Sequence, residues 1–520
     1  MPRFSWSILI LTFVLFDGWM GASAEEVLRV GAAERYRTVS AALAAAKTGS
    51  VIEVTSGTYP ETLVIRKTVE IRGVDAGGGM PVIDGRGDVA PIRVEAGSVV
   101  VEGLAVTSTG SPLRPLSYLT PYLEEACILI VADKVVVRGN RLSGCAQGIY
   151  VRNSDGFVIE DNEVTGNHRG GMMMLNSHRG RVAGNVVADN GIFQGIAVHS
   201  FSFLKGYEYS ARASGLVGDW WKVTAENRDV ADILSEEIEI AGNTVTGHGG
   251  AGIAVSFGRR INIVGNEVHH NGGAEPIEAE VKYFQLELPL RERGAGILLY
   301  CDAYENTVRD NRVYENDNMG IQLGGAHWNR IENNLVETNP YGILVTASVG
   351  NTLIANRVKA SAEFGIRVEG GLYEIFSIAT TVVHNDLDNP GVNAFDDTGT
   401  DNPAPGSGWL DVFPIRKLPP YPLEALKRAN SWDDGVKGNR FSDFDEEPEG
   451  FRDADGDGIG ETPHAIPGGA SVDRFPLAGP GAGARKAEAA IPRLAGSPAC
   501  GTEGACGIDP GLRRTLPCPG

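Results

Sequence analysis

Histidine and methionine meet in one short stretch of the sequence, GNHRGGMMMLNSHRG at residues 166–180. Three consecutive methionines stand there between His168 and His178. Thioether and imidazole groups are ligands that suit copper. Copper binding is therefore the first hypothesis, to be tested against the element that holds these side chains.

A second set of residues suits chemistry on acidic sugars. Arg152 would neutralise a uronate carboxylate, and either His199 or Tyr300 would take the α-proton while the other donates one. These three are the candidate catalytic residues if the protein is a polysaccharide lyase or uronate epimerase. The alternative is a solvated face, or side chains that only hydrogen-bond a bound sugar.

Aromatic residues in the same part of the chain suit the stacking of sugar rings. The candidate ligand-binding residues are Tyr150, Trp220, Trp221 and Tyr283, with Asp302 at the edge of the expected site. Rings of this kind also anchor long loops onto a scaffold, and that alternative stays open.

Carboxylates cluster near the C-terminus in the segment DADGDGIGE. Asp453, Asp455, Asp457 and Glu461 stand on a glycine-rich turn, which suits an oxygen-ligated ion such as Ca²⁺. His464 occupies the twelfth EF-hand position, so the segment is not an EF-hand. The alternative to a calcium site is a solvated acidic turn.

A repeat must position these residues, because two interleaved series hold one period of 22 or 23 residues. The first series is an Asn, mostly in GN or DN, followed by an aliphatic residue, and it starts at 139, 161, 184, 242, 265, 310, 333 and 355. The second series reads GIxV or a close variant and starts at 148, 171, 195, 252, 296, 320, 342 and 365.

Each repeat contains three short runs of alternating apolar and polar residues, broken by Gly, Asn and Asp, which predicts three strands joined by turns. A unit of this length closes as one coil, and stacked coils pair in parallel. The sequence therefore predicts an all-β fold, a single-stranded right-handed parallel β-helix of about 11–12 coils with three long insertions.

This register gives the methionines a structural role. Met172 and Met174 occupy core positions that Ile and Val fill in neighbouring coils, and Met173 points outward. His168 and His178 flank the strand and are too far apart to share an ion. We therefore predict that this stretch is not a metal site.

A turn position five residues after each repeat Asn predicts a ladder of stacked side chains. Its members are Cys145, Asn167, Asn190, His248, Asn271, Asn316, Asn339 and Ser361. His248 replaces an Asn there, and His270 lies one coil on. Ladder membership is favoured over metal ligation for His248.

Three insertions, at 107–126, 200–237 and 274–294, interrupt the period next to the GIxV strands and are expected to wall one sheet. The expected floor between them consists of outward residues of these strands. They are Tyr150, Arg152, Met173, Leu175, Ala197, His199, Ser256, Leu298 and Tyr300.

The composition narrows the possible partners. The formal net charge of −20 disfavours nucleic acid as a partner. Residues 1–24 resemble a cleaved export signal, and no later segment is long and apolar enough to span a membrane. The expected location is the periplasm, cell surface or extracellular space. Cys500 and Cys506 are the easiest local disulfide, and the other pairings stay open.

The expected organisation has five parts. The signal peptide at 1–24 precedes the β-helix at 25–395. A proline-rich linker or strap at 396–429 leads to a C-terminal segment at 430–478, and a disordered cysteine-containing tail occupies 479–520.

The chain resembles the NosD-type family of exported β-helix proteins with carbohydrate-binding and sugar-hydrolase repeats. The resemblance lies in YRTVSAALAAAKTGSVIEVTSGTYPETLVIRKTVEIRG, in the GNxV repeats, and in WDDGVKGNRFSDF followed by DADGDGIGETPHAIPGGASVDRFPL. It implies a periplasmic accessory role in delivering copper to nitrous oxide reductase, with the maturation partners of that reductase. It carries over no copper-ligand motif.

The main hypothesis is an exported, non-catalytic β-helix that binds a surface polysaccharide or glycan, or acts as a NosD-like copper accessory protein. The alternative is a polysaccharide lyase or uronate epimerase that works between the insertions.

Overall fold

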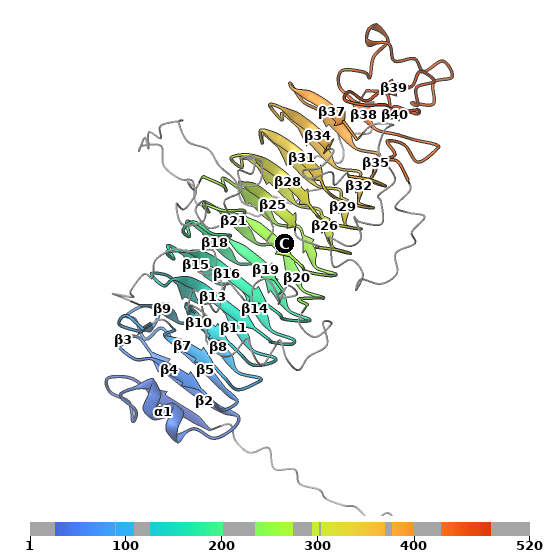
Figure 1. Ribbon diagram of the computed structural model, residues 1–520. Coiled ribbons are helices and arrows are strands. Elements are labelled where there is room, and N and C mark those ends of the chain that lie inside the picture. The colour runs from blue at the N-terminus through green and yellow to red at the C-terminus, as the bar shows by residue number, and fades with distance from the viewer. Residues whose placement is uncertain are drawn as a thin grey trace, which may run out of the picture.

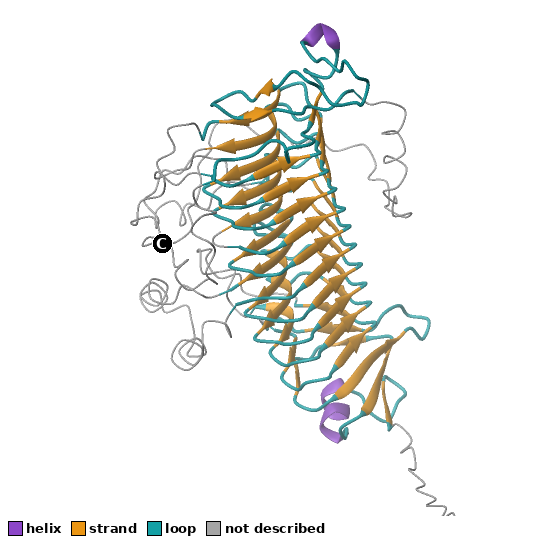
Figure 2. Ribbon diagram, turned by 90° about the vertical axis from the view of Figure 1, so that its right-hand side faces the viewer, coloured by secondary structure: helices purple, strands orange, loops and turns teal. Residues whose placement is uncertain are grey.

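A long stack of short strands forms the body of the molecule (Figures 1 and 2). The computed structural model describes residues 26–88, 90–108, 125–200, 234–273, 294–300, 303–369, 377–398 and 428–479. Three long parallel sheets, named here A, B and C, run along the stack, and almost every coil contributes one strand to each.

Sheet A has 13 strands, in the order β1 (Val27–Val30), β2 (Ser50–Thr55), β5 (Val69–Val74), β8 (Val100–Glu102), β11 (Val136–Arg138), β14 (Val158–Glu160), β17 (Arg181–Ala183), β20 (Glu239–Ala241), β23 (Asn262–Val264), β26 (Thr307–Arg309), β29 (Arg330–Glu332), β32 (Thr352–Ile354) and β35 (Thr381–Val383). Sheet B has 13 strands, in the order β3 (Thr58–Tyr59), β6 (Val82–Asp84), β9 (Ala105–Thr107), β12 (Arg141–Leu142), β15 (Glu163–Thr165), β18 (Val186–Ala188), β21 (Thr244–Thr246), β24 (Glu267–His269), β27 (Arg312–Tyr314), β30 (Leu335–Glu337), β33 (Arg357–Lys359), β36 (Asp386–Asp388) and β38 (Arg440–Phe441). Sheet C has 12 strands, in the order β4 (Leu63–Ile65), β7 (Ile92–Val94), β10 (Ala126–Ile130), β13 (Gln147–Arg152), β16 (Gly170–Leu175), β19 (Ile196–His199), β22 (Ile253–Ser256), β25 (Ala295–Tyr300), β28 (Met319–Gly324), β31 (Tyr341–Thr346), β34 (Phe364–Glu369) and β37 (Val392–Asp396).

The register between coils matches the prediction from the repeat. Ile149 pairs with Met172, and Met172 pairs with Ile196. The predicted all-β parallel β-helix is confirmed, and the 12 strands of sheet C agree with the expected number of coils. One apolar core runs inside the stack and contains Met172 and Met174, whereas Met173 belongs to a separate cluster on the outer face of sheet C.

The predicted ladder is present, and its hydrogen bonds join neighbouring coils. Asn316, for example, donates to the Oδ1 atom of Asn339 from both its backbone N–H (2.9 Å) and its Nδ2 (3.1 Å). His248 belongs to this ladder, because its backbone N–H donates to Asn271 and its Nε2 lies 3.1 Å from the Val187 carbonyl oxygen. The structural role predicted for His248 is confirmed.

A second and longer ladder was not predicted. It consists of the repeat asparagines themselves, Asn140, Asn162, Asn185, Asn243, Asn266, Asn311, Asn334, Asn356, Asn385 and Asn439. All ten are buried, so their side-chain amides supply hydrogen-bond partners to backbone groups that water does not reach at one corner of the coil.

The two ends of the core are covered by different devices. At the first end lies the helix α1 (Val39–Ala45), which Thr38 caps and whose Val39 and Ala42 enter the core cluster. At the other end Trp432, Phe441 and Ile466 join the same cluster. The segment after residue 428 therefore continues the core of the β-helix, rather than packing apart from it.

The C-terminal segment also contains the 3₁₀ helix η7 (Glu447–Glu449) and an antiparallel pair, β39 (His464–Ala465) and β40 (Val472–Asp473). Asp473 ends the long ladder, since its carboxylate accepts from the backbone N–H of Asn439 at 2.6 Å. Burial raises the pKa of Asp473 to about 6.

A disulfide joins Cys127 in β10 to Cys145 at the turn before β13. Both residues are buried in the core, one coil apart. The sequence left this pairing open. The other cysteines, Cys301, Cys500, Cys506 and Cys518, lie outside the described residues, so the Cys500–Cys506 pairing stays a prediction.

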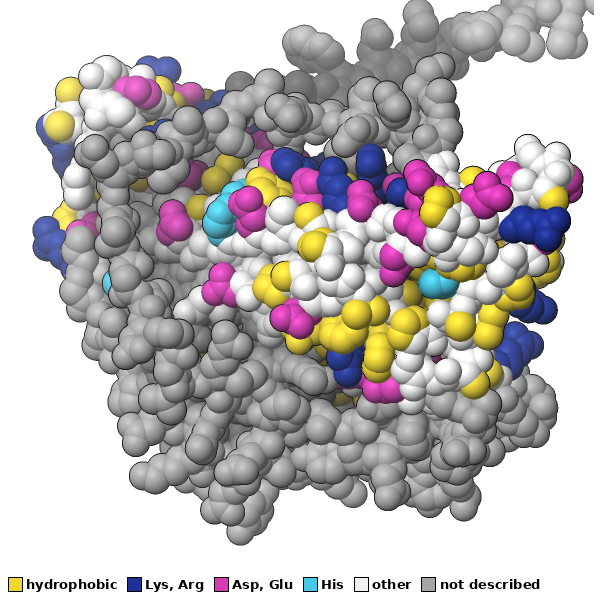
Figure 3. All heavy atoms as spheres, turned by 90° about the horizontal axis from the view of Figure 1, so that it is seen from above, with side chains coloured by type: hydrophobic (Ala, Val, Ile, Leu, Met, Phe, Trp, Pro, Cys, Tyr) yellow, Lys and Arg dark blue, Asp and Glu magenta, His cyan; other side chains and the backbone are white. Residues whose placement is uncertain are grey.

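The outer face of sheet A carries rows of opposite charges. Arg72 and Arg138, two coils apart, donate to the Glu102 carboxylate between them at 2.7 and 2.6 Å. Acidic and basic side chains also lie side by side on the surface shown in Figure 3. Among the described residues, no helix has the length and apolarity needed to cross a bilayer.

Candidate functional site

The three candidate catalytic residues lie in one file on the outer face of sheet C. Strand pairing aligns Arg152 with Leu175, Leu175 with His199, His199 with Ser256 and Ser256 with Tyr300. Paired strands are about 4.8 Å apart, so the backbones of Arg152 and Tyr300 are separated by about 19 Å along the stack. The structure brings the rings of His199 and Tyr300 together, edge to face with centroids 6.1 Å apart, and leaves Arg152 two coils away from His199.

His199 is a neutral base in this structure. Its side chain is buried, and burial lowers its pKa to about 4. At neutral pH the imidazole can therefore accept a proton or hydrogen-bond a ligand, but it carries no charge. Arg152 supplies positive charge to the file at a different coil.

Most of the outward residues of the expected floor are buried. These are Tyr150, Met173, Leu175, Ala197, His199, Ser256 and Leu298, whereas Arg152 and Tyr300 are half-buried. Apolar side chains on this face pack into two clusters of their own, outside the helix core. The alternation of the strands fixed which way these side chains point, but not whether water reaches them.

The remaining candidate ligand-binding residues lie outside the described part of the chain. These are Trp220, Trp221, Tyr283 and Asp302. Tyr150, the fifth, is fully buried beside Met173 in the outer cluster of sheet C. Their roles in ligand binding stay predictions.

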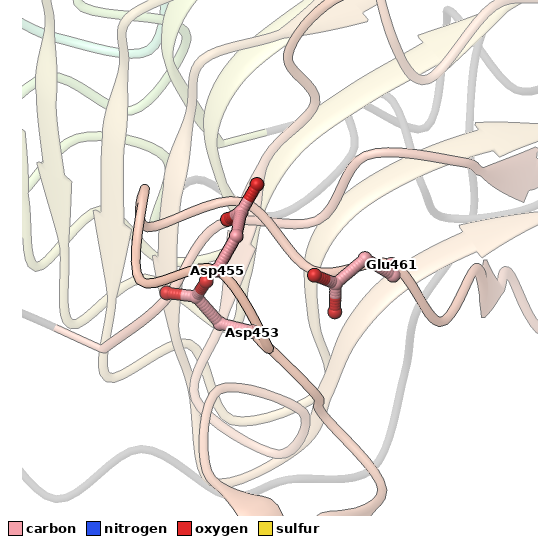
Figure 4. Close-up of side chains that lie close together, drawn as sticks. All are labelled: Asp453, Asp455 and Glu461. Atoms are coloured by element: carbon pink, nitrogen blue, oxygen red, sulfur yellow. The ribbon is translucent and has the colours of Figure 1, made fainter.

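Three of the four predicted calcium ligands come together. Oxygen atoms of Asp453, Asp455 and Glu461 lie within 4.8 Å of one another (Figure 4). Asp457 is not part of this group, and its Oδ1 atom accepts from the backbone N–H of Ile459 at 2.8 Å.

Backbone N–H groups already satisfy two of the clustered carboxylates. Asp453 accepts from Gly456 at 2.7 Å and from Gly458 at 2.9 Å, and both oxygens of Glu461 accept from Ala454. These hydrogen bonds give the carboxylates partners other than an ion, so calcium binding here stays a prediction.

Two imidazoles meet on the outer face of sheet B, at the end of β24. The Nδ1 atoms of His269 and His270 are 2.7 Å apart, and the ring planes are nearly perpendicular. From the sequence, His270 was considered only as a neighbour of the ladder position of His248, and its contact with His269 was not predicted. The dipeptide HH directly before a ladder asparagine is the sequence feature that could have indicated this contact.

Two family models match the chain. The right handed beta helix region matches residues 222–399, and the periplasmic copper-binding protein NosD matches residues 122–216. The chain is therefore similar to the NosD-type right-handed β-helix family. Comparison with curated proteins finds no match.

Several solved structures are similar to this chain at low identity. The A-module of the mannuronan C-5 epimerase AlgE6 from Azotobacter vinelandii is 15% identical, with 68% of this chain and 88% of that chain covered and a TM-score of 0.48. The periplasmic alginate epimerase AlgG is 15% identical over 67% and 72% of the two chains, with a TM-score of 0.33. The Dettilon tailspike protein is 15% identical over 67% and 62%, with a TM-score of 0.44. Likeness at this level carries no argument about a shared substrate.

The soft donors described inside the NosD match do not converge on a copper ion. The three methionines are at most 2% exposed, and Cys127 and Cys145 are bonded to each other. His168 and His178 lie beyond opposite ends of β16. The prediction that the His–Met stretch is structural therefore agrees with its burial and register.

Proposed function

We propose that this chain is an exported NosD-type accessory protein that binds copper as cargo. The match of residues 122–216 to the periplasmic copper-binding protein NosD carries the proposal. Its partners would then be proteins that supply copper to, or take it up for, a copper reductase.

Two features of the chain support export. The N-terminal 24 residues have the pattern of a cleaved signal. The disulfide between Cys127 and Cys145 belongs to an oxidising compartment rather than to the cytosol.

The experiment is elemental analysis of the full chain, purified without a histidine tag from the periplasm of cells grown with added copper. Copper retained through dialysis is the expected result. An Asp453→Asn/Asp455→Asn variant serves as the control, because it removes the acidic turn and should keep the copper. Calcium without copper in the wild-type protein would exclude the accessory role.

A second candidate function is the binding of a polysaccharide along the outer face of sheet C. The file of Arg152, His199 and Tyr300 favours it, because a polymer lying along the stack would pass one of these side chains at every second coil. Their separation suits several sugar units better than one reacting carbon, which favours binding over catalysis.

Catalysis is the further alternative on this face. A lyase would release an unsaturated uronate that absorbs in the ultraviolet, and His199→Ala should abolish that product. Binding of an acidic glycan without any product, weakened by Arg152→Ala, would instead support the non-catalytic form. Neither binding nor product across a broad glycan panel would exclude this candidate.

A further inference from the structure

The His269–His270 pair has a geometry that a strand does not normally allow. Adjacent side chains of a strand point to opposite faces. His270 follows the last residue of β24 and has a positive φ of 54°, which turns its ring back toward that of His269. The two Nδ1 atoms thereby approach to 2.7 Å.

In the ion-free chain one Nδ1 atom carries a proton that bridges the two rings, and an ion bound by the pair would replace this proton. The Nε2 atom of His270 lies 3.2 Å from a carboxylate oxygen of Glu315, so in the neutral ring the proton belongs on Nε2. The hydroxyl of Thr246 lies 3.1 Å from Nδ1 of His269. A carboxylate that accepts from the far nitrogen of a histidine is the usual support for a metal-binding imidazole.

The spacing of the two nitrogens selects a class of ion. Two ligand nitrogens at about 2.0 Å from a metal and at right angles to each other are about 2.8 Å apart, whereas a tetrahedral angle would need about 3.3 Å. The observed 2.7 Å therefore fits a square-planar or tetragonal ion. Nitrogen and oxygen ligands in that geometry are typical of Cu²⁺ and Ni²⁺.

We propose that His269 and His270 form a surface site for a tetragonal divalent ion, Cu²⁺ in the first place. Water and the hydroxyl of Thr246 would complete the coordination. The choice of copper over nickel rests on the proposed function, whereas the site itself rests on the geometry.

Neighbouring side chains hold the pair in place and leave it open to solvent. The Tyr314 ring stacks on the His269 ring, with centroids 4.7 Å apart. The guanidinium of Arg312 lies over the Tyr314 ring, with Cζ 4.2 Å from its centroid. Tyr314 also donates to Glu267 at 2.8 Å. The His270 side chain is 59% exposed, so an ion can reach the pair from solution.

The chain offers a matched control histidine. His384 also precedes a ladder asparagine, has a φ of 58°, and places Nε2 3.0 Å from a carboxylate oxygen of Asp434. It shares the backbone geometry and the acidic partner of His270, but the structure gives it no imidazole contact. His270→Gln and His384→Gln therefore test the pair rather than any turn histidine.

The experiment is titration of the full, untagged chain with Cu²⁺ and separately with Ni²⁺, read by calorimetry and by the nitrogen hyperfine pattern in electron paramagnetic resonance of Cu²⁺. We expect His270→Gln to weaken Cu²⁺ binding by more than about tenfold and Glu315→Gln by about tenfold. The spectrum should change from two coupled nitrogens to one in His270→Gln. His384→Gln should leave affinity and spectrum unchanged.

The outcomes separate this site from the proposed function. Copper bound equally well by the wild type and His270→Gln would overturn the site and leave the copper function standing. In another outcome, the wild type binds nickel, His270→Gln does not, and the wild type retains no copper in the periplasm. This result would support the site and exclude the proposed copper function. If the wild-type chain binds neither ion, the two imidazoles only hydrogen-bond each other, and the proposed site is wrong.

Discussion

The long asparagine ladder makes a sharp prediction about stability, because two neighbouring asparagines differ only in their place in the coil. Asn334 is buried in the ladder, and its Oδ1 atom accepts from the backbone N–H of Asn311 at 3.0 Å and from the Asn311 Nδ2 at 2.9 Å. Its own Nδ2 donates to the Val308 carbonyl at 2.9 Å. Asn333 is exposed, and the one hydrogen bond found for its side chain is donated to the Asp310 carboxylate.

Asn334 Nδ2 also donates to the Oδ1 atom of Asn356 at 2.9 Å, so Asn334→Ala takes a partner from two buried donors and two buried acceptors. Each unsatisfied buried group costs about 1–3 kcal/mol, so the substitution should lower the free energy of unfolding by at least about 3 kcal/mol. Asn333→Ala should cost at most about 1 kcal/mol, since it removes one exposed contact. Alanine is already found with a positive φ at the same turn one coil on, in Ala355.

The assay is urea unfolding of both variants, together with native-state hydrogen exchange of peptides that cover residues 306–340. Exchange is needed because a long solenoid need not unfold in one step. Faster exchange should be confined to the coils next to Asn334. Equal midpoints and equal exchange in the two variants would refute the claim that the ladder stabilises the stack.

Three further predictions concern buried groups. The effect of His248→Asn on the free energy of unfolding should be more favourable at pH 5 than at pH 8 by about 2 kcal/mol. The native pKa of about 4 lies below the ordinary 6.5, so the unfolded wild type binds the extra proton as the pH falls. An equal effect at both pH values would contradict this. The native pKa of Asp473, about 6, lies above its ordinary value. The free energy of unfolding of the wild type should therefore fall by up to about 3 kcal/mol relative to that of Asp473→Asn as the pH rises from 4 to 7. A constant difference between the two proteins would argue against a buried, protonated Asp473. Cys127→Ala/Cys145→Ala should lower the free energy of unfolding by about 3 kcal/mol, as expected for a loop closed over a separation of 18 residues, and an unchanged thermal midpoint under oxidising conditions would show that the bond adds nothing.

The repeat period made the interior of the coil predictable. The positions of Met172 and Met174 follow from strand alternation alone, and so does the rejection of the His–Met stretch as a metal site. His248 was recognisable as a ladder residue because the period placed it among asparagines.

Other features depend on contacts that the period does not describe. The burial of Tyr150 depends on packing outside the coil, which alternation does not report. The Cys127–Cys145 bond was hidden because an insertion separates Cys127 from the preceding repeats. The His269–His270 contact depends on one positive φ, which reverses the direction that a strand would give to the second ring.

Equilibrium dialysis of the full, untagged chain against buffered copper, with zinc and calcium present as competitors, tests the copper-accessory role most directly. We expect the wild type to retain copper in a stoichiometric ratio to the chain, and zinc and calcium not to displace it. We also expect a lower copper content in His270→Gln than in His384→Gln. A protein that leaves dialysis with calcium or zinc and without copper would contradict the copper-accessory role.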